Sequence, residues 1–246
     1  MASPLAQFEI KKLLPIDFYS YDLSLTNSSL AMILSAILII FFLYFGLRNL
    51  NVIPNKSQAA VEMSYEFIAS MIRDNIGKDG FKYLPFIMTL FLFILVGNLF
   101  GMLPYSFTWT SHIIVTFALA FFIFLGVTCI AIYKHGLIKF LGFFAPRGVP
   151  KLMLLLLIPI EIISYLSRPV SLSVRLFANM MAGHTLLKVI GGFVFVLAAN
   201  FYVIGGVIPL LFLVALTGLE IVIAFLQAYV FAILTCLYIN DAIHLH

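Results

Sequence analysis

The sequence predicts an all-α integral membrane protein with about five membrane-embedded helices and one amphipathic surface helix. Hydrophobic residues make up 63% of the chain and charged residues only 10%, against about 25% charged in an ordinary soluble domain. The charges also fall in clumps, and the apolar stretches between them are long enough to cross a bilayer. A water-soluble fold needs a polar shell that this composition does not supply, so the expected solvent is the lipid bilayer.

The same composition argues against several classes of function. The net charge of +4 does not predict nucleic-acid binding, because the basic residues form no patch interleaved with aromatic residues and are typical of topology-setting loops. Cys129 and Cys236 lie in apolar runs without a ligand cluster, which predicts buried thiols and no metal site. The sequence has no Gly-rich phosphate loop, so we expect neither direct nucleotide binding nor a cofactor.

We interpret residues 1–246 as a single membrane domain. An N-terminal segment over 1–28 precedes an apolar run over 30–48 that is long enough to span. A segment over 54–80 mixes charged residues with apolar ones at helical spacing, as in a helix that lies along the membrane surface. Further spans are expected over 83–103 and 112–133.

Charge in the loops predicts the orientation of these helices. Basic residues are concentrated in two loops, 48–82 and 134–151, which places both loops on the negative side of the membrane. The uncharged turn over 104–111 then lies on the opposite side, together with the N-terminus. Trp109, the only tryptophan, is expected at the membrane interface.

The second half of the chain differs because charged residues interrupt its apolar background. Helical stretches over 150–190 and 200–240, with a Gly-containing break between them, predict a two-helix hairpin. An ionisable side chain at the centre of a bilayer costs about 2.5 kcal/mol or more, so it persists where it lines water or meets a partner. The candidates are Glu161, Arg168, Arg175, His184, Lys188 and Glu220.

Helical geometry ranks these candidates. Glu161, Arg168 and Arg175 are spaced seven residues apart and lie on nearly one face. Ser171 and Asn179 continue this polar stripe, which favours a narrow hydrated path. A structural ion pair or snorkelling explains Arg168 equally well.

A second group is expected on the other side of the first hairpin helix. His184 follows Arg175 by nine residues and so points to the opposite face. Glu220 and Gln227 are nearly aligned on the second helix, beside small residues that allow another helix to approach. His184 and Glu220 are therefore expected to meet and relay protons. The guanidinium of Arg175 stays protonated, which suits it to repelling protons and pairing with a carboxylate.

Two long segments carry a resemblance to a known family. Residues 169–184, PVSLSVRLFANMMAGH, strongly resemble the signature of subunit a of F-type ATP synthases, as does the end GLEIVIAFLQAYVFAILTCLYINDAIHLH. SPLAQFEI near the start and TNSSL before the first span are similar to mitochondrial members. The resemblance implies the stator proton-channel subunit of the Fo sector, not an enzyme by itself, with its last two helices forming a long tilted hairpin against the c-ring.

The resemblance also implies partners and a location. The partners are the c-ring subunits, the peripheral stalk and other Fo membrane subunits. The location is the mitochondrial inner membrane, with the plasma membrane of a related bacterium as the alternative.

Residue roles follow from the same resemblance. The family's essential arginine falls on Arg175, which faces the c-ring carboxylate and separates two offset half-channels. The access half-channel falls on His184 and Glu220, in the arrangement of mitochondrial members, since many bacterial members have the two residue types exchanged. The acidic residue of the other half-channel falls on Glu161. The conserved asparagine, glutamine and tyrosine fall on Asn179, Gln227 and Tyr238.

Two other functions stay open at this point. A secondary transporter would carry paired broken helices in both halves, whereas the polar residues here are concentrated in the second half. In a purely structural membrane subunit, Arg175 and Glu220 would be snorkelling or paired, and replacing either would leave proton flux intact. The scarcity of further carboxylates and hydroxyls favours protons over sodium as the transported ion.

Overall fold

The computed structural model describes residues 9–14, 17–18, 21–22, 24–48, 50–103, 106–143, 151–200 and 202–244. In chain order its helices are α1 (Asn27–Leu47), α2 (Lys56–Asn75), η2 (Lys78–Tyr83), α3 (Leu84–Gly101), η3 (Trp109–Ser111), α4 (Ile113–His135), α5 (Leu137–Phe143), α6 (Lys151–Asn200) and α7 (Tyr202–Ile243), where η2 and η3 are 3-10 helices. Within these ranges, five helical segments are long and apolar enough to cross a membrane. They confirm the predicted all-α membrane fold.

The N-terminal segment contains short strands that the sequence did not predict. β1 (Lys12–Leu14) pairs antiparallel with β4 (Leu25–Thr26), and β2 (Asp17–Phe18) pairs with β3 (Tyr21–Asp22). Thr26 ends the last strand and begins α1, because its hydroxyl accepts from the Ser29 backbone N–H while the Ser29 hydroxyl accepts from the Thr26 N–H. This reciprocal capping box satisfies two of the free N–H groups at the start of α1.

The predicted surface helix is α2, and only one of its faces is buried. Val61, Ile68 and Ile72 are at most 4% exposed, whereas Glu62 and Glu66 are exposed. The α-helix ends at Asn75, earlier than the predicted position 80. Gly77 ends it with a φ of 82°, a backbone conformation that glycine adopts without strain.

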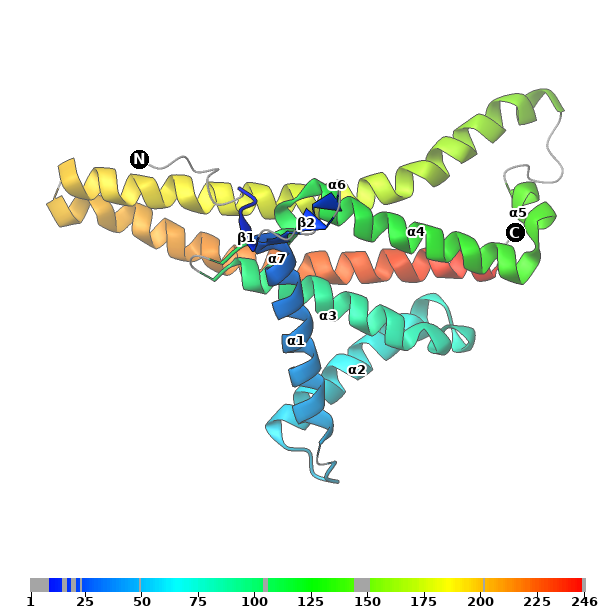
Figure 1. The fold of residues 1–246 in the computed structure, drawn as a ribbon, viewed down its shortest axis with the longest axis horizontal. Coiled ribbons are helices and arrows are strands. Elements are labelled where there is room, and N and C mark those ends of the chain that lie inside the picture. Colours follow the sequence, from blue (N-terminus) through cyan, green and yellow to red (C-terminus); the bar gives the residue numbers. More distant parts are fainter. Residues whose placement is uncertain are drawn as a thin grey trace.

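The hairpin helices α6 and α7 are longer than predicted, since α6 continues through the expected break at Gly191 and Gly192 to Asn200. At 1.5 Å per residue α6 is about 75 Å long, more than twice the roughly 30 Å hydrocarbon core. A helix of this length cannot stand upright within the core, so a strong tilt is required. Figure 1 shows α6 and α7 side by side, running across the direction of α1.

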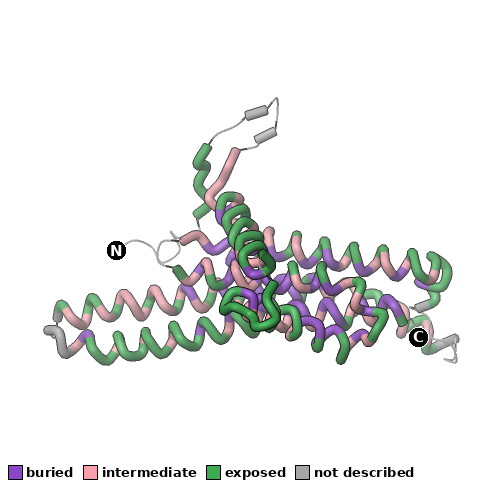
Figure 2. The backbone as a smooth tube through the Cα atoms, turned by 90° about the horizontal axis from the view of Figure 1, so that it is seen from below, coloured by how far each residue is buried: buried purple, intermediate pink, exposed green. Residues whose placement is uncertain are grey.

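The core lies where the middle of the hairpin meets α3 and α4. Figure 2 shows burial concentrated there, while the arm formed by the end of α6 and the start of α7 is largely exposed. Ala224, Ala228 and Ala232 follow each other at helical spacing on α7 and are fully buried. These small side chains allow neighbouring helices to approach closely. The arm presents large apolar residues such as Phe195 and Ile208, as a surface in contact with lipid or another subunit would.

Trp109 is buried inside the protein rather than exposed on its surface, and its depth at the membrane interface stays a prediction. Its side chain is fully buried, its ring centroid lies 4.7 Å from that of Phe93, and its Nε1 donates to Ser35 Oγ at 3.4 Å. A Cβ at Gly97 would lie 2.3 Å from the indole ring. The indole therefore fills a space on α3 that only glycine leaves open, and it anchors η3 against the core.

The two cysteines differ in exposure. Cys236 is buried, as predicted, but Cys129 is exposed. Apolar neighbours in the sequence do not distinguish a residue that faces other helices from one on the outer surface of α4.

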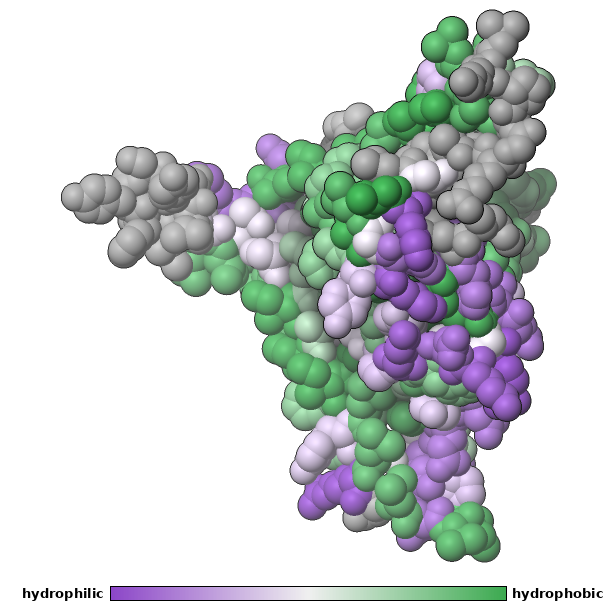
Figure 3. Space-filling model, turned by 90° about the vertical axis from the view of Figure 1, so that its right-hand side faces the viewer, coloured by the Kyte–Doolittle hydropathy of each residue, from purple (hydrophilic) through white to green (hydrophobic). Residues whose placement is uncertain are grey.

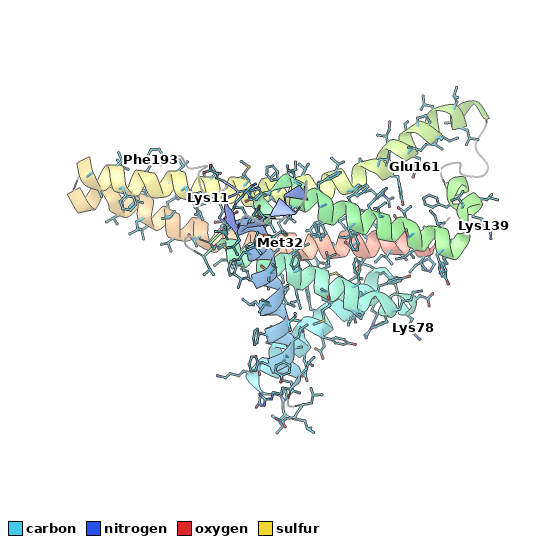
Figure 4. The ribbon with its side chains drawn as sticks, viewed as in Figure 1. Lys11, Met32, Lys78, Lys139, Glu161 and Phe193 are labelled. Carbon is cyan, nitrogen blue, oxygen red and sulfur yellow. The ribbon has the colours of Figure 1, made fainter. Side chains whose placement is uncertain are left out.

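One lysine of each basic loop, Lys78 and Lys139, lies at the same end of the molecule (Figure 4), and Figure 3 shows hydrophilic side chains over part of that face. This arrangement is consistent with the two loops sharing one side of a membrane, and which side that is stays a prediction. Residues 144–150 of the second loop and 104–105 of the uncharged turn lie outside the described residues.

Candidate functional site

The structure brings His184 of α6 and Glu220 of α7 together. The imidazole Nδ1 lies 3.2 Å from the carboxylate Oε1, and the two residues are 5% and 4% exposed. Gly183 makes this approach possible, because a Cβ there would lie 2.7 Å from Glu220 Oε1. Two groups that can each gain or lose a proton are thus paired in the interior of the hairpin.

A third residue, Thr108, completes this contact and was missed by the sequence analysis. Its hydroxyl lies 3.3 Å from His184 Nε2 and donates to the backbone carbonyl of Gly101 at 3.3 Å. Thr108 is 1% exposed and is the N-cap residue of η3. The imidazole therefore has a polar partner at each of its two nitrogens.

Several buried polar atoms near the ends of α3 and α4 have no hydrogen-bond partner within the described chain. They are Asn98 Oδ1, Thr110 Oγ1, His112 Nε2 and both carboxylate oxygens of Glu220. Glu220 Oε1 lies within ion-pair distance of His184, but the angles do not meet those of a hydrogen bond. Buried polar groups in proteins are nearly always paired, commonly with internal water. These five atoms therefore need partners that the described chain does not supply.

Two of the residues that carry these atoms are held in place by neighbouring elements. Asn98, fully buried on α3, donates from Nδ2 to the carbonyl of Ala224 at 3.2 Å, one helical turn beyond Glu220. His112 stacks on Phe107 with ring centroids 4.9 Å apart, and burial lowers the pKa of the His112 imidazole. The available sequence signal was the hydroxyl-rich run over 106–112 and an isolated asparagine in an uncharged span.

Arg175 lies on the other side of α6 from His184. It is exposed, and the part of the chain that the structure describes contains no ion-pair partner for it. Ser171 is also exposed, whereas Asn179 and Gln227 are partly buried. The described chain shows no side-chain hydrogen bond or ion pair between Arg175 and these three residues.

Arg168 pairs with a carboxylate on the neighbouring helix. Its guanidinium forms an ion pair with Asp241 of α7 at 3.0 Å and lies 5.3 Å and 5.0 Å from the ring centroids of Tyr165 and Tyr238. Arg168 therefore forms the structural ion pair that the sequence left open. The ring of Tyr238 lies against the same guanidinium. Pro169 lies inside α6 between the two arginines, where it removes a backbone hydrogen bond and favours a kink.

Glu161 is remote from both groups. It lies on the part of α6 that diverges from α4 and α7 (Figures 1 and 4) and is partly exposed. Its separation from Arg175 along the helix is about 21 Å. Among the described residues, no group of three or more His, Cys, Asp or Glu side chains is arranged to hold a metal ion.

Comparisons with known proteins agree on one family. The family model described as ATP synthase A chain matches residues 29–240. ATP synthase subunit a of Pelagibacter ubique is 55% identical over 245 residues, which cover 99% of this chain and 98% of that protein. The Rhodospirillum rubrum subunit a is 56% identical over 246 residues and the Paramagnetospirillum magneticum one 54% over 249, with both chains covered completely.

These relatives are bacterial. They support subunit a in general rather than its mitochondrial branch in particular. Together with the several apolar helices, they fit the plasma membrane of a bacterium, the alternative location, better than the mitochondrial inner membrane.

Proposed function

This chain belongs to the ATP synthase A chain family, the proton-channel stator subunit of the Fo sector, and on that premise we propose that its hairpin separates two functions on opposite faces of α6. His184 and Glu220 form the relay of the access half-channel. Arg175 forms the barrier that faces the c-ring. The observation that carries this assignment is the buried His184–Glu220 pair behind an exposed Arg175 that has no ion-pair partner in the described chain.

As a subunit a, the chain is a component of Fo rather than a catalytic subunit by itself, and membership implies Fo partners such as the c-ring. We further assign the peripheral stalk and other Fo membrane subunits as partners of its single membrane domain over 1–246. No direct nucleotide contact is part of this role.

The surroundings of Arg175 suit a close approach by the ring. An unpaired guanidinium on an apolar helix surface is costly in lipid, so a carboxylate from outside the chain would stabilise it. Ser171, Ala178 and Ala182 share its face at spacings of three and four residues, and all are exposed. Small residues of this kind let another helix come near, which brings the ring carboxylate within reach of the guanidinium.

The buried His184–Glu220 pair passes the proton to the ring. In the proposed path a proton arrives from the positive side, passes through His184 and Glu220, and neutralises a ring carboxylate. After the ring has turned, Arg175 displaces the proton, which leaves near Glu161. One elementary charge crossing 100 mV yields about 2.3 kcal/mol, so the ring sums several crossings for each ATP.

The remaining predicted residues complete this path. We place the amide side chains of Asn179 and Gln227, both partly buried, between the pair and the ring, and Ser171 beside Arg175. We place Tyr238, whose ring lies against Arg168, near the other half-channel. Protons remain the proposed ion, which unchanged activity on addition of sodium at fixed pH would support.

The test uses membrane vesicles that carry the assembled complex with Arg175→Ala, Glu220→Gln or Arg168→Ala. We expect the first two variants to lose ATP-driven proton pumping while ATP hydrolysis persists, and only Arg175→Ala to leak protons passively. Arg168→Ala is the matched control, an arginine on the same helix with a partner inside the chain. If pumping survives in both Arg175→Ala and Glu220→Gln, these residues are structural and the assignment is wrong.

A further inference from the structure

We infer that Thr108 is a positioning residue that holds His184 in the tautomer with its proton on Nε2, which leaves Nδ1 free to exchange a proton with Glu220. The inference rests on the proposed relay role of His184 and Glu220 and adds the residue that sets its protonation geometry. Thr108 is remote in sequence from both, and neither its residue type nor its spacing marks it.

The hydroxyl of Thr108 has one hydrogen and two neighbours. Gly101 is the last residue of α3, and the carbonyls of a final helical turn lack partners within the helix. A carbonyl can only accept, so the Thr108 hydrogen points to Gly101 O, 3.3 Å away. The hydroxyl oxygen then serves as the acceptor toward His184 Nε2, also 3.3 Å away, and Nε2 must carry the imidazole proton.

This tautomer decides what the other nitrogen can do. With the proton on Nε2, the neutral imidazole presents a lone pair at Nδ1, 3.2 Å from Glu220 Oε1. Once the two groups align, a proton can move from the carboxyl to Nδ1 to form imidazolium and carboxylate, and back. In the opposite tautomer, Nδ1–H faces the carboxylate, and moving that proton would leave an imidazolate. Thr108 thus favours the tautomer in which transfer is feasible.

The position of Thr108 is set by two close contacts. A Cβ on Gly101 would lie 2.5 Å from its Oγ1 and Cγ2, so the side chain rests directly on the α3 backbone. The next residue, Trp109, is fully buried and holds η3 against the core. The hydroxyl therefore has little freedom to turn away from the imidazole.

Few other groups can influence the imidazole. From α7 it faces Glu220, and Lys188 lies one turn further along α6. From the η3 side, within the described chain, the uncharged hydroxyl of Thr108 contacts it.

The experiment compares Thr108→Val and Thr108→Ser in the assembled complex. Valine keeps the branched shape and removes the hydroxyl, while serine keeps the hydroxyl. ¹⁵N NMR of histidine-labelled complexes reports the tautomer of His184, whose signals are identified by their loss in His184→Gln. Thr116→Val is the matched control, since Thr116 is equally buried and its hydroxyl donates only to backbone carbonyls at the start of its own helix.

We expect Thr108→Val to lose the preference for Nε2–H and to lower ATP-driven proton flux about fivefold, the factor that one hydrogen bond of ordinary net strength provides. Thr108→Ser and Thr116→Val should keep both the tautomer and the flux. Thr108→Ala removes the hydroxyl without adding volume, and it replaces Thr108→Val if that variant does not assemble.

An unchanged Nε2–H signal in Thr108→Val, or a changed tautomer with unchanged flux, would overturn this inference. Neither result affects the proposed function, which depends on the Arg175 and Glu220 variants. Conversely, pumping that survives Glu220→Gln rejects the relay itself, whatever the tautomer of His184.

Discussion

His184 Nδ1 and Glu220 Oε1 lie 3.2 Å apart, while the carboxylate makes no hydrogen bond to any other group in the described chain. The pair is therefore isolated from other protein partners on its carboxylate side. Proton transfer within the pair should therefore depend on the two groups themselves, on Thr108 and on internal water. Exchanging the two residue types tests this directly.

Exchanging the two residue types tests whether the pair acts as a unit. We expect His184→Glu and Glu220→His each to lower ATP-driven proton flux at least about tenfold, because each single change places two like groups in contact. The double exchange should recover flux several-fold over either single variant, since contacting residues are not additive. Flux in the double variant that equals the product of the two single losses would show that they act independently.

Gly183→Ala tests the close approach of the carboxylate to α6. The added Cβ would lie 2.7 Å from Glu220 Oε1, so the carboxylate must move away from His184. Displacing a reacting group by a fraction of an ångström to one ångström costs about tenfold or more, and we expect such a loss of proton flux in vesicles. Gly126→Ala on α4 is the control, because a Cβ there meets nothing within 4 Å. Equal losses of proton flux in both variants would show that displacement of the Glu220 carboxylate is not the cause.

Arg168 and Asp241 should contribute modestly to stability and not to the proton barrier. Their side chains are 22% and 47% exposed, and exposed ion pairs are worth about 1 kcal/mol or less after screening. We expect Arg168→Gln and Asp241→Asn to lower slightly the temperature at which the chain dissociates from the detergent-solubilised complex, with a double variant no worse than the sum. Passive proton leak through Arg168→Gln vesicles would contradict a purely structural role.

We predict that the folded chain loses stability in mild acid because the imidazole of His112 becomes protonated. Burial lowers its pKa in the folded chain below the ordinary value of 6.5, so the folded state binds fewer protons than the unfolded state just below that pH. The stability that the neutral imidazole provides is complete above about pH 6.5 and is lost as pH falls through the folded pKa. The dissociation temperature should fall from about pH 7.5 to about pH 5.5, and less steeply in His112→Gln. Parallel curves for the two proteins would exclude His112 as the cause.

The parts of the site that could be predicted are those that depend on one helix. The opposite directions of Arg175 and His184 follow from nine residues at 100° each, and the structure has one exposed and the other buried. The same argument placed Arg168 and Arg175 on one face of α6, but it could not name the partner of Arg168. The ion pair with Asp241 joins residues 73 positions apart, which no helical periodicity reports.

The residues that surround the His184–Glu220 pair could not be predicted, because they come from the connection between α3 and α4 rather than from a predicted helix. Thr108 and Trp109 lie in a turn whose uncharged sequence suggested an interface, yet η3 within it packs against α3 and α6. The glycines that admit it, Gly97 and Gly101, looked like ordinary residues of an apolar span. Only the distances of about 2.5 Å or less that a Cβ would have there show why they are glycine.

The sequence by itself determined the solvent, the helices and the family, because apolar length, helical period and local motifs are properties of contiguous segments. The tertiary structure alone decided which further polar groups meet. The contact of Thr108 with His184, the burial of Trp109 and the pairing of Arg168 with Asp241 all depend on how close two backbones approach. That distance is set by the small side chains at helix contacts, and their effect appears only when both partners are in place.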